Sequence, residues 1–274
     1  MSSVTRRPRV KGVVVRASRE VATAAAELGA IILGSAVRGA IEGVKSLASE
    51  VELKPVCDIE FGSLGAHPDR RSVEAIRAAT VSVLMQCVVG KPDQLAGSAR
   101  LLAAATSPAE ASATSHQLLA AVRAEHHSAF ANRLVEACTN ASMSAGFTAV
   151  NVATSGTELI RVVATNNAGH ALVSELYLPM VAPPGLATEV VGIHDGTCIA
   201  ILDRFDAALE AEGVHSTSPK REYTGGVCEL AAARAFVSKT LNPTPLAEDL
   251  SGEQSRARRR DGLIRPQNRG RGPA

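Results

Sequence analysis

A change in hydrophobic period at Gly146 constrains the fold of this chain more than any other sequence feature. Upstream of it, Ser107-Pro108-Ala109-Glu110 combines a capping serine, a proline at the first helical position and a capping-box glutamate. These residues predict a long helix that ends at Gly146. Downstream, apolar residues alternate with polar ones or run continuously, as they do in strands. The sequence therefore predicts an α+β protein.

The part after Gly146 is expected to form a small antiparallel or mixed sheet covered by two helices. Asn166-Asn167-Ala168-Gly169 has the composition of a hairpin turn between two of its strands. A glycine follows the first of the two helices, where a helix commonly ends. The expected strands are residues 147–152, 159–165, 170–178 and 188–193, and the expected helices are residues 197–212 and 225–239.

Charge and composition suggest four segments. Residues 1–20 and residues 251–274 each carry a net charge of +5, which leaves −8 for the rest of a chain whose total is +2. Arg-, Gly- and Pro-rich segments cannot bury a core, so the tail is predicted to be disordered, like the basic leader. The predicted segments are a disordered leader (1–17), an Ala-rich helical domain (18–146), an α+β module (147–240) and a disordered Arg-rich tail (241–274).

The five cysteines indicate a reducing compartment. They are widely spaced, form no CxxC pair and are odd in number, so a disulfide-stapled secreted fold is not expected. The chain is therefore predicted to be cytoplasmic. Close-spaced metal-ligand pairs are also missing from the sequence, and no run of about 20 strongly apolar residues occurs. No metal, no cofactor and no membrane association are expected.

Two cysteines are candidates for reactive thiols. Cys198 and Cys228 are each expected in the first turn of a helix, where free amides and the helix dipole stabilise a thiolate. His194 lies close enough in sequence to Cys198 to act as a base or a cation. The alternative is that both cysteines are small apolar residues that face the sheet, which is the usual role of a free cysteine.

Thr224-Gly225-Gly226 is a candidate anion site. The threonine supplies a helix cap, and the two glycines let backbone amides approach a phosphate or carboxylate. The same residues also suit an ordinary tight turn from a strand into a helix. No glycine-rich nucleotide-binding pattern accompanies them, so the turn is the simpler interpretation.

His126 occupies the apolar stripe of the long helix that begins after Ser107. Together with Glu125 and His127 it invites a metal-site interpretation, but the spacing does not place two ligands on one helical face. A histidine satisfied by hydrogen bonds in a core or interface is the preferred hypothesis.

The arginine-rich tail is a candidate contact surface. Arg256, Arg258, Arg259 and Arg260 could bind nucleic-acid phosphates without sequence preference or contact an acidic protein partner. Because few aromatic residues accompany them, base stacking is not indicated. A tail that only increases solubility is the third possibility.

The function predicted from these patterns is a non-enzymatic binding or assembly module with a protein partner or with itself. Long amphipathic helices with small-residue faces favour it, and no nucleophile elbow or other catalytic constellation is present in the sequence. Two alternatives stay open. One is a thiol-dependent enzyme or redox protein that uses a helix N-terminal cysteine, and the other is weak nucleic-acid association through the basic tails.

Overall fold

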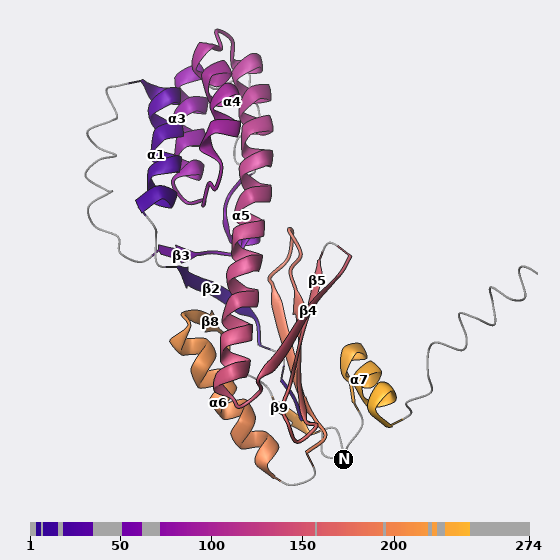
Figure 1. Ribbon diagram of the computed structural model, residues 1–274. Helices are drawn as coiled ribbons and strands as arrows, with labels where there is room; N and C mark the ends of the chain where they lie inside the picture. The colour runs from indigo at the N-terminus through magenta and orange to yellow at the C-terminus, as the bar shows by residue number, and fades with distance from the viewer. Residues whose placement is uncertain are drawn as a thin grey trace, which may run out of the picture. The chain divides into compact units, whose positions relative to one another are not determined.

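The computed structural model of this chain has the predicted α+β fold, in which a helical part precedes an antiparallel sheet (Figure 1). Contacts divide the chain into two compact units, Met1–Ala233 and Arg234–Ala274. The described part of the chain forms six α-helices. The structure describes residues 4–6, 8–15, 19–34, 51–61, 72–156, 158–193, 196–218, 221–223 and 228–241.

The long helix α5 (Pro108–Ser144) forms as the sequence predicts. Ser107 Oγ accepts a hydrogen bond from Glu110 N at 3.2 Å, and Glu110 Oε2 accepts one from Thr106 N at 3.1 Å, so side chains satisfy amides at the start of the helix. Gly146 ends it with φ +101, a conformation that favours glycine. Figure 1 shows α5 running beside the other N-terminal helices and on past the sheet.

The helical part packs around its own apolar core. It contains α1 (Arg19–Leu33), α3 (Val73–Leu84) and α4 (Pro92–Ala104), and Ser72 caps α3 by accepting a hydrogen bond from Ala75 N. The first half of α5 completes this core, whereas its second half belongs to the core under the sheet, so α5 joins the two. Buried members of the helical core include Leu28, Ile76, Leu84, Leu102 and Leu118.

The larger sheet has six strands, all antiparallel, in the order β4-β5-β6-β7-β1-β9. The predicted hairpin turn forms between β5 and β6: Gly169 has φ +77, and Asn166 Oδ1 accepts hydrogen bonds from Ala168 N and His170 N. The strands are β4 (Ala149–Ser155), β5 (Leu159–Thr165), β6 (Ala171–Tyr177), β7 (Gly185–Val191), β1 (Val4–Arg6) and β9 (Arg221–Tyr223).

The N-terminal residues differ from the expected disordered leader. Val4–Arg6 is β1 of the larger sheet, and β2 (Val10–Val15) is the centre of a small sheet. Its partners are β3 (Val51–Leu53) and β8 (Val214–Ser216). The side chains of Val10 and Val13 are buried, so apolar burial and long-range strand pairing outweigh the basic composition of this segment.

Helices α5 and α6 (Thr197–Ala211) cover one face of the larger sheet. Phe130 and Leu134 of α5 and Phe205 of α6 share a core with the strand residues that point to this face. α6 begins at the predicted residue and ends one residue before the predicted residue 212; Gly213, whose φ is +80, follows. A Cβ atom at that glycine would lie 2.7 Å from Val14 Cβ, so β2 packs closely against the end of α6.

On the opposite face of the sheet, two carboxylates hold the chain segment that leads into α7 (Ala231–Leu241). The fully buried Glu189 of β7 accepts hydrogen bonds from Glu229 N and Leu230 N at 2.9–3.2 Å, and Glu175 Oε1 of β6 accepts one from Ala232 N at 3.3 Å. The prediction that this helix begins at Gly225 is therefore wrong, because the bonds from Glu229 and Leu230 hold those residues in a non-helical segment just before Ala231.

Candidate functional site

Three polar side chains within four residues of α5 hold neighbouring segments by hydrogen bonds at the junction between the helical part and the sheet, and we call them anchors. The first is His126, which is fully buried. Its Nδ1 accepts a hydrogen bond from Val88 N at 3.0 Å, so the ring proton lies on Nε2, which donates to Lys54 O at 2.8 Å. Burial lowers the pKa of His126 and favours this neutral form. The prediction of a satisfied core histidine is confirmed.

The second anchor is Glu125, which binds the same connection between α3 and α4 as His126, two residues further along. Its Oε2 accepts hydrogen bonds from Gly90 N at 3.0 Å and Lys91 N at 3.3 Å. Lys91 is the N-cap residue of α4, so the carboxylate lies where the positive end of the helix dipole stabilises it. Glu125 therefore fixes the start of α4 against α5. No group of three or more potential metal ligands occurs among the residues that the structure describes.

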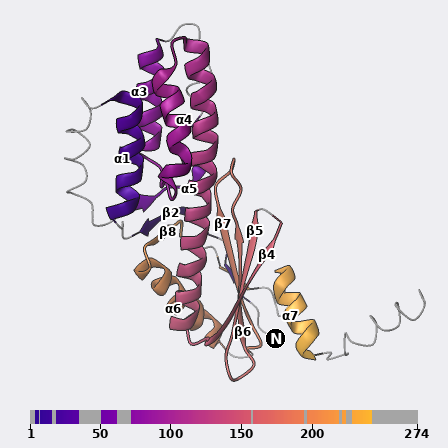
Figure 2. The same cartoon turned by 45° about the horizontal axis from the view of Figure 1, so that its top comes forward.

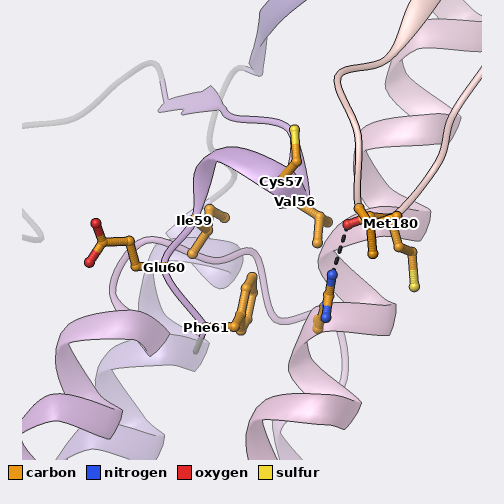
Figure 3. A pocket seen from close by; sticks show the side chains of 8 residues that line it. Val56, Cys57, Ile59, Glu60, Phe61 and Met180 are labelled. Carbon is orange, nitrogen blue, oxygen red and sulfur yellow. Dashed lines mark hydrogen bonds between the residues drawn. The ribbon is translucent and has the colours of Figure 1, made fainter. Parts of the chain in front are cut away.

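The third anchor, Arg123, lies at an open hollow with a volume of about 500 Å³ (Figure 3). Its Nη2 donates to Met180 O at 2.8 Å, and its guanidinium carbon is 5.6 Å from the centroid of the Phe61 ring, within the range of a cation–π contact. Its buried Nε has no hydrogen-bond partner in the described part of the chain. The hollow is lined by Val56, Cys57, Ile59, Glu60, Phe61, Arg123, Met180 and Val181.

Most of the residues that line this hollow have apolar side chains, but polar atoms contribute as much of its exposed surface as apolar ones, and its rim exposes an apolar side chain. Figure 3 shows Ile59 and Phe61 across from Met180, whereas the Glu60 carboxylate points away from it. Val181, in the loop after β6, is 82% exposed. Among the large apolar side chains of the described residues, that of Val181 is the most exposed.

The one thiol in the hollow is poorly suited to nucleophilic chemistry. Cys57 Sγ donates to Asp58 Oδ1 at 3.4 Å. Burial, and then the neighbouring Asp58 carboxylate, raise the pKa of the Cys57 thiol. Burial also raises the pKa of Cys87 to about 12. The thiolate is the reactive form, so both groups stay protonated near neutral pH and react slowly.

Three ionisable side chains outside the hollow, those of His127, Glu158 and Tyr177, interact with one another or with Arg123. Burial lowers the pKa of His127, while Glu158 opposes this shift and Arg123 adds to it. The charge of Glu158 and a hydrogen bond to it raise the pKa of the Tyr177 hydroxyl, and this tyrosine is half exposed. His127 is therefore within electrostatic reach of Arg123, which lines the hollow, and of Glu158, which interacts with Tyr177.

Of the two candidate thiols, only that of Cys198 lies in the first turn of a helix. Cys198 lies in the first turn of α6, as predicted, but it is only 2% exposed and packs in the core with Ile201 and Leu202. Cys228 is half buried and lies three residues before Ala231, the first residue of α7, and so not in the first turn of a helix as predicted. The location of Cys198 matches the description of a small apolar core residue.

Several predicted site residues lie outside the described residues. They are His194, the candidate base; Thr224, Gly225 and Gly226, the candidate anion site; and Arg256, Arg258, Arg259 and Arg260, the candidate contact residues of the tail. Within the described segment just after this glycine pair, the amides of Glu229 and Leu230 already bind the carboxylate of Glu189. These two amides are therefore occupied by the carboxylate of Glu189 and are not available to bind a phosphate or carboxylate from solution.

Sequence reasoning missed the hollow. Its residues come from the segment around η2 (Val56–Asp58), from α5 and from the loop after β6, and no local pattern links them. The available signal was weak: Arg123 precedes the polar pair Glu125 and His126 on a helix that carries many other polar residues. Among the described helices, none is long and apolar enough to span a membrane. No family model, curated protein or solved structure matches the chain.

Proposed function

We propose that the chain is a non-enzymatic binding module whose hollow receives an apolar side chain of a protein partner. The observation that carries this proposal is the open hollow of mixed polar and apolar surface that is lined by Val181, an 82% exposed valine, together with Ile59, Phe61 and Met180. The hollow has the volume of a typical binding pocket.

The composition of the hollow resembles the centre of a protein interface. Aromatic residues, methionine and arginine are enriched in interface cores, and Phe61, Met180 and Arg123 supply one of each. Arg123 stacks near the Phe61 ring and holds the Met180 carbonyl, so the lining is ordered before a partner arrives. Preorganisation of this kind reduces the entropy cost of binding.

The contacts of α5 support the same proposal. Glu125 and His126 both bind the connection between α3 and α4, His126 also binds Lys54 O, and Arg123 binds the loop after β6. These hydrogen bonds stabilise the walls of the junction and leave none of the three side chains as a reactive group. The thiol of Cys57 beside the hollow is protonated at neutral pH. These features favour recognition over catalysis.

A cytoplasmic location is part of this proposal. The five cysteines are widely spaced, odd in number and form no CxxC pair, as is usual in a reducing compartment. A partner in the same compartment would then be the natural ligand.

The test compares two aspartate variants of the full chain, both at exposed apolar positions. Val181→Asp places a charge at the rim of the hollow, whereas Leu101→Asp, on the 64% exposed Leu101 of α4, is the matched control. Proteins retained from a lysate of the source cells would be quantified by mass spectrometry for wild type and both variants.

We expect at least one protein to be retained by wild type and by the Leu101→Asp variant but to fall at least about tenfold with Val181→Asp, since a charge desolvated without a partner costs more than about 1.4 kcal/mol. Equal retention by both variants, or no specifically retained protein, would refute the proposal. Thermal unfolding of each variant checks that the fold is intact.

A further inference from the structure

The outer edge of β4 differs from every other sheet edge in the described residues. β4 is an edge strand of seven residues at one end of the larger sheet, next to β5 (Figure 2). The edge at the other end, β9, has three residues and includes Arg221 and Glu222. The edges of the small sheet, β3 and β8, also have three residues each and carry Glu52 and His215.

These short, charged edges have the features that prevent one sheet from pairing with another, and β4 has none of them. Its sequence, Ala-Val-Asn-Val-Ala-Thr-Ser, contains no charged residue and no proline. Six of its seven residues are exposed and the other, Val150, is half buried. A long, neutral edge strand presents free backbone donors and acceptors, which another strand can pair with.

β4 is also complementary to itself. When two antiparallel copies are related by a two-fold axis, only a register centred on Val152 pairs all seven residues of one strand with all seven of the other. In this register Val152 faces Val152 of the second copy, and Val150 faces Thr154. Both pairs lie on the helix-covered side, since Val150, Val152 and Thr154 pair with Ala164, Val162 and Ile160 of β5. No like charges meet.

We propose that two copies of this chain associate by pairing their β4 strands antiparallel across a two-fold axis at Val152. The two larger sheets then form one continuous sheet. Val152 is 46% exposed in the single chain and becomes the centre of the contact. This inference goes beyond the proposed function and does not depend on it, because the hollow does not include any residue of β4.

The contact is small, so a weak and reversible dimer is expected. Pairing of two seven-residue edges buries less area than the standard interface of about 1,200–2,000 Å². The dissociation constant should therefore be on the order of 10–100 μM, and the dimer should appear only as concentration rises.

Two experiments on the full chain test this proposal. The first is sedimentation equilibrium from about 1 to about 300 μM, a range that brackets the expected affinity. Val152→Lys places two like charges opposite each other and should raise the dissociation constant at least about tenfold. Leu101→Lys, at an exposed position of α4, is the control for added charge and should leave it unchanged.

The second experiment is disulfide cross-linking under mild oxidation. The Cβ atoms of directly opposite residues are about 4.5–5.5 Å apart, close to disulfide geometry, so a Val152→Cys variant should form a covalent dimer. A Thr154→Cys variant should not, since the two substituted residues would lie about 13 Å apart along the strands. Oxidised wild type gives the background from the five native cysteines.

A monomer at every concentration would overturn the proposal. So would a dimer that Val152→Lys does not weaken, or equal cross-linking of the two cysteine variants. The Val181→Asp variant should leave self-association unchanged, and Val152→Lys should leave capture of a partner at the hollow unchanged. Failure of one proposal is therefore distinguishable from failure of the other.

Discussion

Replacement of His126 by leucine should destabilise the chain by about 2–4 kcal/mol at pH 7.5. The side chain is fully buried, and its ring satisfies Val88 N at 3.0 Å and Lys54 O at 2.8 Å. Each buried group left without a partner costs about 1–3 kcal/mol. Val88 is buried, so its unpaired amide should bear the full cost. Lys54 is an exposed residue, so its unpaired carbonyl should cost less, and the total should lie below twice the cost of one fully buried group.

The same variant should remove a pH-dependent part of the stability. Burial lowers the pKa of His126 in the folded chain below the ordinary value of 6.5 that applies when the chain is unfolded. Below that value the unfolded chain binds more protons at this residue than the folded chain does, so stability falls as the pH falls. His126 thus contributes stability that is complete above about pH 6.5 and is lost progressively below it, by at most about 1.4 kcal/mol per pH unit.

Urea unfolding of wild type and His126→Leu from pH 7.5 to pH 5 measures both effects. The difference between the two proteins isolates His126, because the other histidines are common to both. We expect this difference to shrink as the pH falls below 6.5. A loss of less than about 0.5 kcal/mol at pH 7.5 would show that the two hydrogen bonds contribute little, which would refute the reasoning from buried polar groups. A difference that does not change with pH would contradict the assignment of a neutral, buried imidazole.

Two further predictions concern the backbone. Ser107→Ala removes the side-chain acceptor of Glu110 N and should lower the free energy of unfolding by about 1 kcal/mol in urea; an unchanged value would mean that another group caps α5. Gly213→Ala should cost about 1–3 kcal/mol, because φ is +80 and the new Cβ atom would lie 2.7 Å from Val14 Cβ. Gly90→Ala, where a Cβ atom would meet nothing within 4 Å, is the control; equal losses in the two variants would contradict this packing argument.

The sequence predicted correctly the helix ends and the turn that are determined by residues close to them in the chain. Ser107 and Glu110 cap α5, Gly146 ends it, and the turn at Asn166 to Gly169 forms where expected. These residues act within a few positions of themselves, so their effect can be predicted without knowing the rest of the fold.

Long-range pairing explains what sequence reasoning missed. Thr5 of β1 pairs with Glu189 of β7, and Val13 of β2 pairs with Val214 of β8, so the strands of the leader depend on residues far along the chain. The basic residues around them suggested disorder. The start of α7 was missed for a related reason, since the carboxylate of Glu189 on a distant strand fixes the amides before Ala231.

The candidate site could be predicted only in part. The sequence placed His126 on the apolar stripe of α5, and its satisfied core role is confirmed. The hollow joins Phe61, Arg123 and Met180, which lie far apart in the sequence, so its existence depends on how three segments pack. The edge strand β4 was predicted as a strand, but its position at the edge follows from the strand order of the whole sheet.

Photo-cross-linking from the rim of the hollow tests the central claim most directly. A photoreactive amino acid would replace Val181 in one preparation and Leu101 in another, and both full-length chains would be irradiated in the source cells. The account predicts a discrete covalent product with a second protein from position 181 that is missing from position 101. No product from position 181, or the same products from both positions, would contradict the proposal that the hollow binds a protein partner.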